Sequence, residues 1–386
     1  MKKAITGLFM LLVLLACLMC AHAQEAMDIT KEVVFHIGKG RIDPKEMVDR
    51  RYTTFYTLRK GGSFRVVSEN QAISGVKVQF YEQAARCTVE ALVEDDWTEI
   101  GQVGAYLSDW VSVPAGVTQL RLTNLSDGRA YFAEITVYGE GDAPADAPVW
   151  HVADKADMML VVAHPDDELL WFGGFLPTYA GERGLTVQVV YVVPTMPNRR
   201  LELLDGLQHC GVQVYPAFVG MADMRANTLE GQYKLWNRQR LYNTMTALVR
   251  QYRPDVVVTQ DFRGEYGHGA HRATADATVK AVEFAMDSSM HPDSAKQYGL
   301  WQVSKVYVHL YGENRVQLDW HVPLERFGGK DGMTVATEAL ACHVSQVKHG
   351  WTMEEGGQND NSLFGLYFTA VGMDENGNDL MEHIAR

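Results

Sequence analysis

A histidine and two aspartates directly follow an apolar run, and their spacing is suited to metal chemistry. The run 158–163 contains only Met, Leu, Val and Ala, as expected for a buried parallel strand. His164 and Asp167 follow it, three residues apart, and Pro165 restricts the backbone between them. Open α/β sheets bind their ligands at the carboxyl ends of the strands. The segment therefore predicts an imidazole and a carboxylate aimed at one point, half of a metal site, with Asp166 beside it.

The other half of such a site lies about a hundred residues downstream. Residues 254–259 form a second strand candidate, and the polar loop 260–267 leads from it to His268 and His271. An amphipathic helix is expected from about residue 272 to 286, so His271 lies at its start. Two histidines and one aspartate make a three-ligand set that leaves a coordination position open for water. Such a set is typical of catalytic zinc, whereas structural zinc is closed by four protein ligands.

Together these motifs resemble a known enzyme family. A strand followed by Ala-His-Pro-Asp-Asp-Glu, with a later His-x-x-His, is similar to the PIG-L/LmbE-type zinc-dependent N-deacetylases over roughly residues 155–386. Those enzymes remove acetyl groups from molecules that contain N-acetylglucosamine. Two further stretches extend the resemblance: Arg199-x-x-Glu202 followed by Cys210-Gly211-Val212, and residues 341–346, which are similar to the family's His-x-Ser-Gln.

The resemblance implies a role for each matching residue. The ligands of Zn²⁺ that it implies are His164, Asp167 and His271. Asp166 becomes the general base, and His268 the imidazole that faces the reacting carbonyl. Arg199 is assigned to substrate binding, with a solvated helix face as the alternative. His343 is expected either in the core or as a support behind the site.

One position departs from the family pattern. The family often has His-Pro-Asp-His where this chain reads His268-Gly269-Ala270-His271. The missing carboxylate would have oriented or charged a neighbouring side chain, so the protonation state of His268 is left open. Glu265 and Asp261 are the candidates to replace it.

Composition limits the classes of partner. At 386 residues the chain is long enough for two domains. A net charge of −13 and a pI near 5.5 give no indication of a nucleic-acid or anionic-membrane partner. No Gly-x-Gly-x-x-Gly follows the strand at 158–163, so no dinucleotide cofactor is expected.

The first 23 residues have the features of a secretory signal peptide. Lys2 and Lys3 precede the uncharged apolar run 5–19, and Ala21-His22-Ala23 is a small-x-small cleavage site. We therefore expect an exported protein, secreted or periplasmic or at the cell surface. The alternatives are lipoprotein processing at Cys17 and a retained membrane anchor. Cleavage after Ala23 leaves three widely spaced cysteines, which do not form a disulfide framework.

From residue 151 to 386, apolar runs alternate with amphipathic stretches. This alternation predicts an α/β Rossmann-like doubly wound sheet. Strands are expected at 158–163, 187–193, 212–215, 256–259 and 305–310. Helices are expected at about 169–181, 199–209, 232–252 and 272–286.

Residues 24–140 follow a different pattern. Short runs alternate between apolar and polar residues, as in 76–80, and glycine or Asp/Asn turns separate them. They predict an all-β sandwich that is similar to the discoidin-like, galactose-binding-type jelly rolls. Its aromatic residues make a glycan a candidate ligand, which would give this domain an accessory role. Residues 141–150 are rich in Gly, Ala and Pro and are expected to be a linker.

These observations predict an exported zinc hydrolase that removes the acetyl group from an N-acetylated amino sugar or its glycoconjugate. Two alternatives stay open. One is a carbohydrate-binding or adhesion protein whose hydrolase domain is weak or inactive. The other is an amidase acting on a non-sugar N-acyl substrate, because the metal interacts only with the amide.

Overall fold

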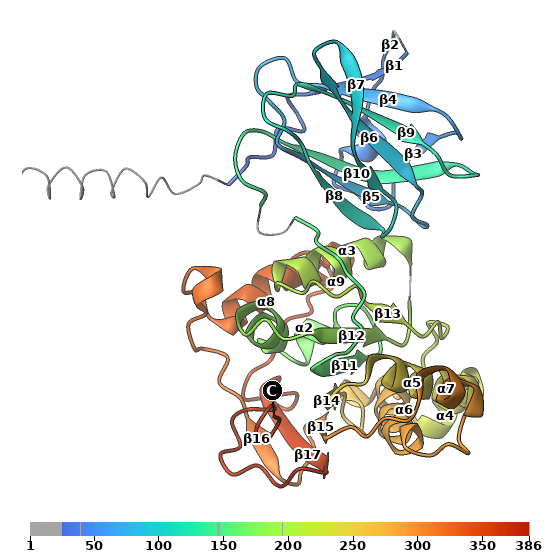
Figure 1. Cartoon of the computed structure of the whole chain (residues 1–386). Helices are drawn as coiled ribbons and strands as arrows, with labels where there is room; N and C mark the ends of the chain where they lie inside the picture. Colours follow the sequence, from blue (N-terminus) through green and yellow to red (C-terminus); the bar gives the residue numbers. More distant parts are fainter. Residues whose placement is uncertain (1–24, 39, 145–146, 195, 386) are drawn as a thin grey trace, which may run out of the picture.

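The computed structural model describes residues 25–38, 40–144, 147–194 and 196–385. The predicted signal peptide, including Cys17, lies outside these residues. The described chain forms a β-sheet part at its N-terminal end and a larger α/β part below it (Figure 1). No helix in the described ranges has the length and apolar character needed to cross a membrane.

Two antiparallel sheets make up the N-terminal part. The six-stranded sheet has the order β2-β1-β4-β9-β6-β7, with β1 (Val34–Ile37), β2 (Gly40–Arg41), β4 (Ser63–Val67), β6 (Cys87–Val93), β7 (Asp96–Val103) and β9 (Gln119–Asn124). The four-stranded sheet has the order β3-β10-β5-β8, with β3 (Tyr56–Leu58), β5 (Gly75–Phe80), β8 (Ser108–Ser112) and β10 (Ala130–Tyr138). Alternate residues of each sheet face inward, so Phe64 of one sheet meets Phe132 of the other at 5.3 Å between ring centroids.

A seven-stranded mixed sheet is the centre of the C-terminal part. Its order is β13-β12-β11-β14-β15-β17-β16, with β11 (Met158–Val162), β12 (Val187–Tyr191), β13 (Ala217–Phe218), β14 (Val256–Thr259), β15 (Lys305–His309), β16 (Arg315–Gln317) and β17 (Leu363–Thr369). The first five strands are parallel to one another, and β17 runs antiparallel to its two neighbours, β15 and β16. All four of β11, β12, β14 and β15 are buried throughout, as expected for strands covered on both faces.

Helices cover both faces of this sheet. On one face lie α2 (Asp167–Leu170), α3 (Pro197–His209), α8 (Gly332–Leu340) and α9 (Val344–Val347). On the other lie α4 (Leu229–Leu235), α5 (Arg238–Tyr252), α6 (Gly269–Ala285) and α7 (Pro292–Tyr298) (Figure 1). Alternate residues of β11 accordingly belong to two separate hydrophobic cores, Leu160 with the first set and Val161 with the second.

Three sequence-based expectations about individual elements are wrong. The helix expected at 232–252 is broken into α4 and α5, because the Asn237 side chain accepts a hydrogen bond from the Arg240 amide and starts a new helix there. The helix expected at 169–181 is replaced by the four-residue α2 and a π-helical turn at Pro177–Glu182. The strand expected at 212–215 is only an isolated bridge between Val214 and His151, and β13 follows it.

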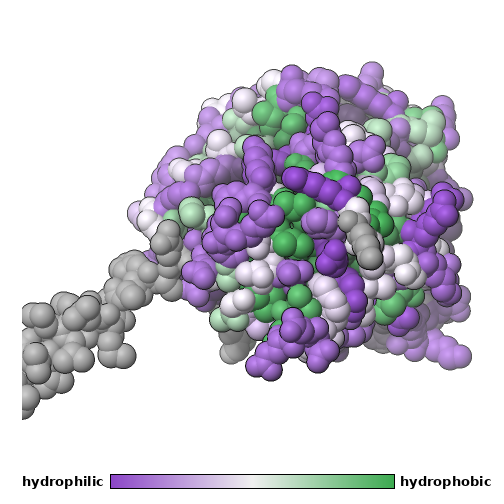
Figure 2. Space-filling view, turned by 90° about the horizontal axis from the view of Figure 1, so that it is seen from above, coloured by the Kyte–Doolittle hydropathy of each residue, from purple (hydrophilic) through white to green (hydrophobic). Residues whose placement is uncertain are grey.

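The two parts are joined by a buried polar contact. Asp205 on α3 accepts hydrogen bonds from Lys77 Nζ at 2.7 Å, Gln79 Nε2 at 2.9 Å and the Tyr52 hydroxyl. Lys77 and Gln79 are on the outward face of β5, yet both are buried, because Asp205 of α3 packs against them. We call Asp205 and its three donors the junction cluster. The opposite end of the N-terminal part is mostly hydrophilic, with small separate apolar patches (Figure 2).

Candidate active site

Three residues from two strand ends lie close together at the carboxyl edge of the sheet. His164 and Asp167 follow β11, and His271 lies in the first turn of α6, after β14. One donor atom from each lies within 4.8 Å of the others. The Oδ2 atom of Asp167 is 3.3 Å from His164 Nδ1 and 3.5 Å from His271 Nε2. The structure thus brings together the three residues that the sequence analysis assigned as metal ligands.

The surroundings of these residues fit a bound divalent metal ion. His271 Nε2 is buried and has no hydrogen-bond partner among the described residues, although buried nitrogens are normally satisfied. Its other nitrogen, Nδ1, lies 2.7 Å from Glu265 Oε2. Trp171 Nε1 donates to Asp167 Oδ1 at 2.8 Å, which leaves Oδ2 facing the two histidines. A carboxylate behind a histidine is the usual arrangement around a metal-binding imidazole.

Glu265 is itself part of a buried chain of charges. Its second oxygen, Oε1, lies 2.7 Å from His309 Nδ1 on β15, and all three side chains are fully buried. Burial alone would raise the pKa of Glu265, but the hydrogen bonds with His271 and His309 lower it to about 2. The carboxylate is therefore charged and holds both imidazoles in place.

The neighbouring aspartates differ in their ionisation. Burial, followed by the charge of Asp167, raises the pKa of Asp166 well above its usual range. Burial would also raise the pKa of Asp167, but the charge of His271 and the hydrogen bonds with His164 outweigh it and hold the pKa far below its usual range. Two adjacent carboxylates whose pKa values are pushed apart are suited to different tasks, the charged one to metal binding and the other to proton transfer.

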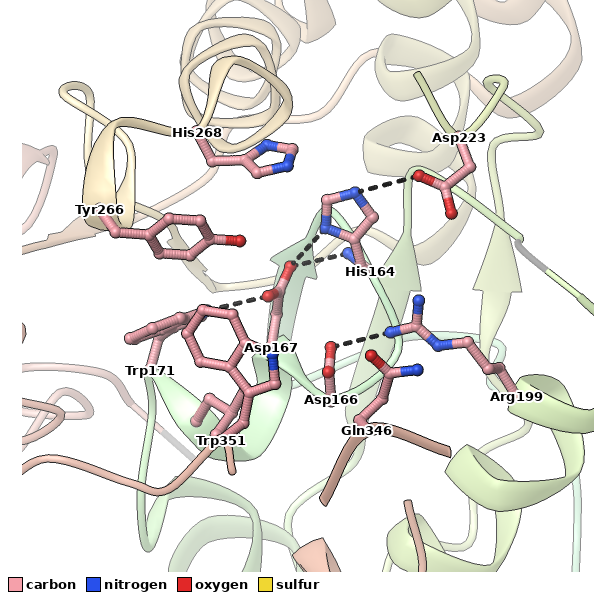
Figure 3. Close-up of a pocket in the computed structure, with 11 residues that line it drawn as sticks. His164, Asp166, Asp167, Trp171, Arg199, Asp223, Tyr266, His268, Gln346 and Trp351 are labelled. Atoms are coloured by element: carbon pink, nitrogen blue, oxygen red, sulfur yellow. Dashed lines mark hydrogen bonds and ion pairs between the residues drawn. The ribbon is translucent and has the colours of Figure 1, made fainter. Parts of the chain in front are cut away.

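Asp166 is held in an unusual conformation. Its φ of 110° lies in the left-handed region that residues with a side chain rarely adopt. Its amide donates to Glu168 Oε2 at 2.8 Å, and its Oδ1 accepts from Arg199 Nη2 at 3.1 Å. Arg199 also donates to the carbonyl of Pro165. Arg199 therefore lies in the site, not on a solvated helix face, and it fixes the carboxylate that the sequence analysis assigned as general base (Figure 3).

His268 and Asp166 lie on opposite sides of His164 and Asp167 (Figure 3). It caps α6, and its Nδ1 accepts a hydrogen bond from the Ala270 amide at 3.2 Å. Burial, followed by the charges of His271 and His164, lowers the pKa of His268 to about 3. The ring is consequently neutral, and its proton lies on Nε2. Neither the Glu265 nor the Asp261 carboxylate forms a hydrogen bond with the His268 ring, and Glu265 bonds to His268 only through its backbone carbonyl, which accepts from the His268 amide at 3.1 Å. The carboxylate that Ala270 lacks is therefore not replaced at this ring.

A cavity of about 150 Å³ lies between these residues. The lining residues that the sequence analysis did not assign to the site are Leu170, Trp171, Asp223, Tyr266, Gln346 and Trp351. Gln346 belongs to the family-like stretch 341–346, which was a usable signal. Asp223 and Trp351 lie in irregular segments, and no sequence pattern marks them. The rings of Trp171, Tyr266 and Trp351 form a wall, with centroids 5.2–6.2 Å apart.

The family-like C-terminal stretch supports the site from behind. His343 is fully buried, with Nε2 3.0 Å from Glu168 Oε1. Ser345 donates through its hydroxyl, at 2.5 Å, and through its amide, at 3.2 Å, to Glu202 on α3. His343 is therefore a support behind Asp166, and the Arg-x-x-Glu and His-x-Ser-Gln stretches meet in one network.

Comparisons with known proteins agree with this site. Residues 159–282 match the PIG-L family, described as GlcNAc-PI de-N-acetylase. The 1D-myo-inositol 2-acetamido-2-deoxy-alpha-D-glucopyranoside deacetylase 1 of Frankia casuarinae is 30% identical over 233 residues, which are 52% of this chain and 74% of that protein. The corresponding enzyme of Rhodococcus jostii is 27% identical over 229 residues, which are 52% of this chain and 70% of that protein.

Among solved structures, N,N'-diacetylchitobiose deacetylase from Pyrococcus horikoshii aligns with 50% of this chain and 71% of its own, at a TM-score of 0.38 and 19% identity. A cluster of two histidines and an aspartate at the carboxyl ends of α/β strands is typical of a metal-dependent enzyme. This chain belongs to the PIG-L family of de-N-acetylases. It is an N-deacetylase, and the deacetylases of this family depend on a metal ion.

Proposed function

We propose that the protein is an exported, zinc-dependent hydrolase that removes the acetyl group from an N-acetylglucosamine-type sugar or its glycoconjugate. The observation that carries this proposal is the grouping of His164, Asp167 and His271 with Asp166 and His268 around one cavity. The Frankia casuarinae and Rhodococcus jostii relatives are named for a 2-acetamido-2-deoxy-glucopyranoside substrate, which supports an amino sugar.

The two imidazoles and one carboxylate suit zinc, which takes nitrogen and oxygen ligands in sets of three at catalytic sites. Zinc held by His164, Asp167 and His271 would lower the pKa of a water molecule to about 7 and would polarise an amide carbonyl. The residues of the chain then provide the proton transfers and the binding of the substrate.

Asp166 acts as the general base in this proposal. Its raised pKa makes it a better proton acceptor than an ordinary aspartate, and Arg199 fixes its Oδ1. Asp166 takes a proton from the water that attacks the acetyl carbon. It then gives that proton to the nitrogen as the C–N bond breaks, so that acetate and a free amine leave.

His268 stabilises the oxygen of the attacked carbonyl. The neutral ring carries its proton on Nε2, because Nδ1 accepts from the Ala270 amide. A donor placed where negative charge develops typically contributes about 10²- to 10³-fold in rate. The lowered pKa also keeps this ring neutral at neutral pH.

Acetate release from a panel of N-acetylated sugars tests the proposal, with zinc present at one equivalent. We expect turnover on N-acetylglucosamine compounds and much less on N-acetyl amino acids. Turnover confined to N-acetyl amino acids would instead identify the non-sugar amidase. Absence of acetate from every substrate, with zinc bound, would contradict the deacetylase mechanism and favour the binding-protein alternative.

Export, the finer fold and the role of the N-terminal part belong to the same proposal. Lys2, Lys3 and the apolar run 5–19 support cleavage after Ala23, which N-terminal sequencing of the mature protein will test.

The strand order of the parallel part supports a Rossmann-like doubly wound sheet. If β11 is counted as strand 1 and the later parallel strands follow in chain order, their order across the sheet is 3-2-1-4-5. The paired antiparallel sheets support a jelly-roll sandwich, with glycan as its candidate ligand.

A further inference from the structure

A second cavity, of about 380 Å³, adjoins the active-site cavity and shares Tyr266 with it. Its polar lining comes from the loop after β14, the first turn of α6 and the loop before β17. The polar side chains that line it are Asp261, Arg263, Arg272, Gln358 and Asn359. The first cavity is small enough to be filled by an acetamide group and its immediate neighbours. The second cavity therefore lies where a further part of the substrate would extend.

The charges in this cavity do not balance. Both oxygens of Asp261 face Arg263: Oδ1 accepts from its amide at 3.1 Å, and Oδ2 is 3.4 Å from its Nε. Arg272 has no ion pair with any described carboxylate, and its Nε is buried without a hydrogen-bond partner. One positive charge is thus left over beside the active site of a chain whose net charge is −13.

A purely structural arginine in this chain has a very different environment. Arg250 is fully buried and donates to five backbone carbonyls and to the Ser294 hydroxyl. Arg272, by contrast, has no side-chain hydrogen bond to a described residue. Its stem packs against Gly264, where a Cβ would lie 3.0 Å from Arg272 Cγ. Its Nη2 lies beside Gly267, and Arg272 lines the cavity together with both glycines.

We propose that this second cavity binds an anionic group of the substrate, a phosphoryl or a carboxylate, with the Arg272 guanidinium as its main partner. The proposal rests on the proposed function, in which the acetamide occupies the neighbouring cavity. A guanidinium presents several N–H donors in a planar fork that matches the oxygens of carboxylate and phosphate. Tyr266, between the two cavities, separates the reacting amide from the anion.

Steady-state kinetics on matched substrates test this inference. The substrates are N-acetylglucosamine, its 1-phosphate, and N-acetylmuramic acid, which carries a carboxylate, and the enzymes are the zinc-loaded full chain and its Arg272→Gln variant. A charge-assisted hydrogen bond contributes about 1.5–3 kcal/mol, so the variant should lose about ten- to hundredfold in kcat/KM on an anionic substrate. The loss should be in KM, because the contact is present before and during the reaction. Turnover of neutral N-acetylglucosamine should be unchanged. The substrate whose kcat/KM falls most in the variant shows whether the natural anionic group is a phosphoryl or a carboxylate.

Arg225→Gln is the matched control. Arg225 lies over the same Tyr266 ring, 5.6 Å from its centroid, but does not line the second cavity. This variant removes an equal charge and should change the ratio of anionic to neutral turnover by less than about threefold in 0.15 M salt. Equal losses on all substrates in Arg272→Gln, or no preference of the wild type for either anion, would overturn the anion site and leave the deacetylase proposal intact.

Calorimetric binding to the metal-free protein separates the two proposals if no substrate is hydrolysed. Without metal, phosphate is not attracted to the three ligands. Two cationic places then remain that could favour the sugar phosphate, Arg199 in the first cavity and Arg272 in the second, and the Arg272→Gln variant tells them apart. The anion site is supported if the 1-phosphate or N-acetylmuramic acid binds more tightly than neutral N-acetylglucosamine and if the Arg272→Gln variant loses this difference. Equal affinities for the three sugars would overturn it.

Discussion

At the scale of single residues, the adjacent aspartates of the His-Pro-Asp-Asp motif have opposite environments. Asp167 is held between two histidines and a tryptophan, whereas Asp166 faces Arg199 and the cavity. We expect Asp166→Asn to keep the metal and to lose about 10²- to 10⁴-fold in kcat. Asp167→Asn should lose the metal as well as activity. Elemental analysis of the two variants decides, and equal loss of metal in both would show that the roles are misassigned.

We expect Glu265 to strengthen metal binding although it is not itself a metal ligand. It holds His271 Nδ1 at 2.7 Å, and the loss of such a supporting carboxylate typically costs about 10- to 100-fold in affinity. Glu265→Gln should therefore release zinc to a chelator at a correspondingly lower chelator concentration. Glu283→Gln is the control, because Glu283 is on α6, the helix that carries His271, but is exposed and forms an ion pair only with Lys280 among the described residues. If both variants retain zinc like the wild type, Glu265 does not support the ligand.

At the scale of elements, α3 connects the N-terminal part with the active site. Its first turn carries Arg199, its middle carries Glu202, and Asp205 receives the donors of the junction cluster. Asp205→Ala leaves Lys77 buried without its carboxylate, which typically costs about 3–5 kcal/mol. We expect a lower Tm together with a lower kcat, since the helix that holds Arg199 is loosened.

A double replacement is the check on this explanation. Lys77→Met combined with Asp205→Leu removes both charges and should recover most of the lost stability, because apolar pairs replace buried ion pairs well. Thermal unfolding of the two single variants and the double variant gives the coupling between the two positions. Additive losses would show that the two side chains do not depend on each other.

The sequence predicted the strands that carry the site better than the helices around them. Fully apolar runs such as 256–259 mark buried parallel strands, and they place His164 and Asp167 opposite His271. The α/β character of this part and the β-sheet content of the N-terminal part are confirmed. The break between α4 and α5 was missed because the Asn237 cap falls inside a continuous amphipathic pattern. Lining residues such as Asp223 and Trp351 depend on loop paths, for which periodicity gives no signal.

At the scale of the whole molecule, Glu134 makes the stability of the N-terminal part depend on pH. Burial raises the pKa of Glu134 to about 7, from 4.5 in the unfolded chain. The folded state therefore holds a proton that the unfolded state has lost between these values, and stability falls as pH rises from about 4.5 to about 7.

Glu134→Gln should remove this dependence, because the amide imitates the protonated carboxyl. Above pH 7 the variant should gain at most about 3 kcal/mol over the wild type, and at pH 4.5 the two should be equal. Denaturant unfolding at pH 5 and pH 8 measures the difference. An equal change with pH in both proteins would assign the effect to other groups.

The left-handed backbone conformation of Asp166 lowers the stability of the fold, whereas its side chain is needed for activity. A residue with a side chain at a φ of 110° typically costs about 1–3 kcal/mol, and glycine adopts this conformation freely. Asp166→Gly should thus melt at a higher temperature than Asp166→Ala while both are inactive. A laboratory selection for heat resistance alone would tend to lose the aspartate at this position. Thermostable variants of this enzyme must consequently be selected under a simultaneous demand for turnover.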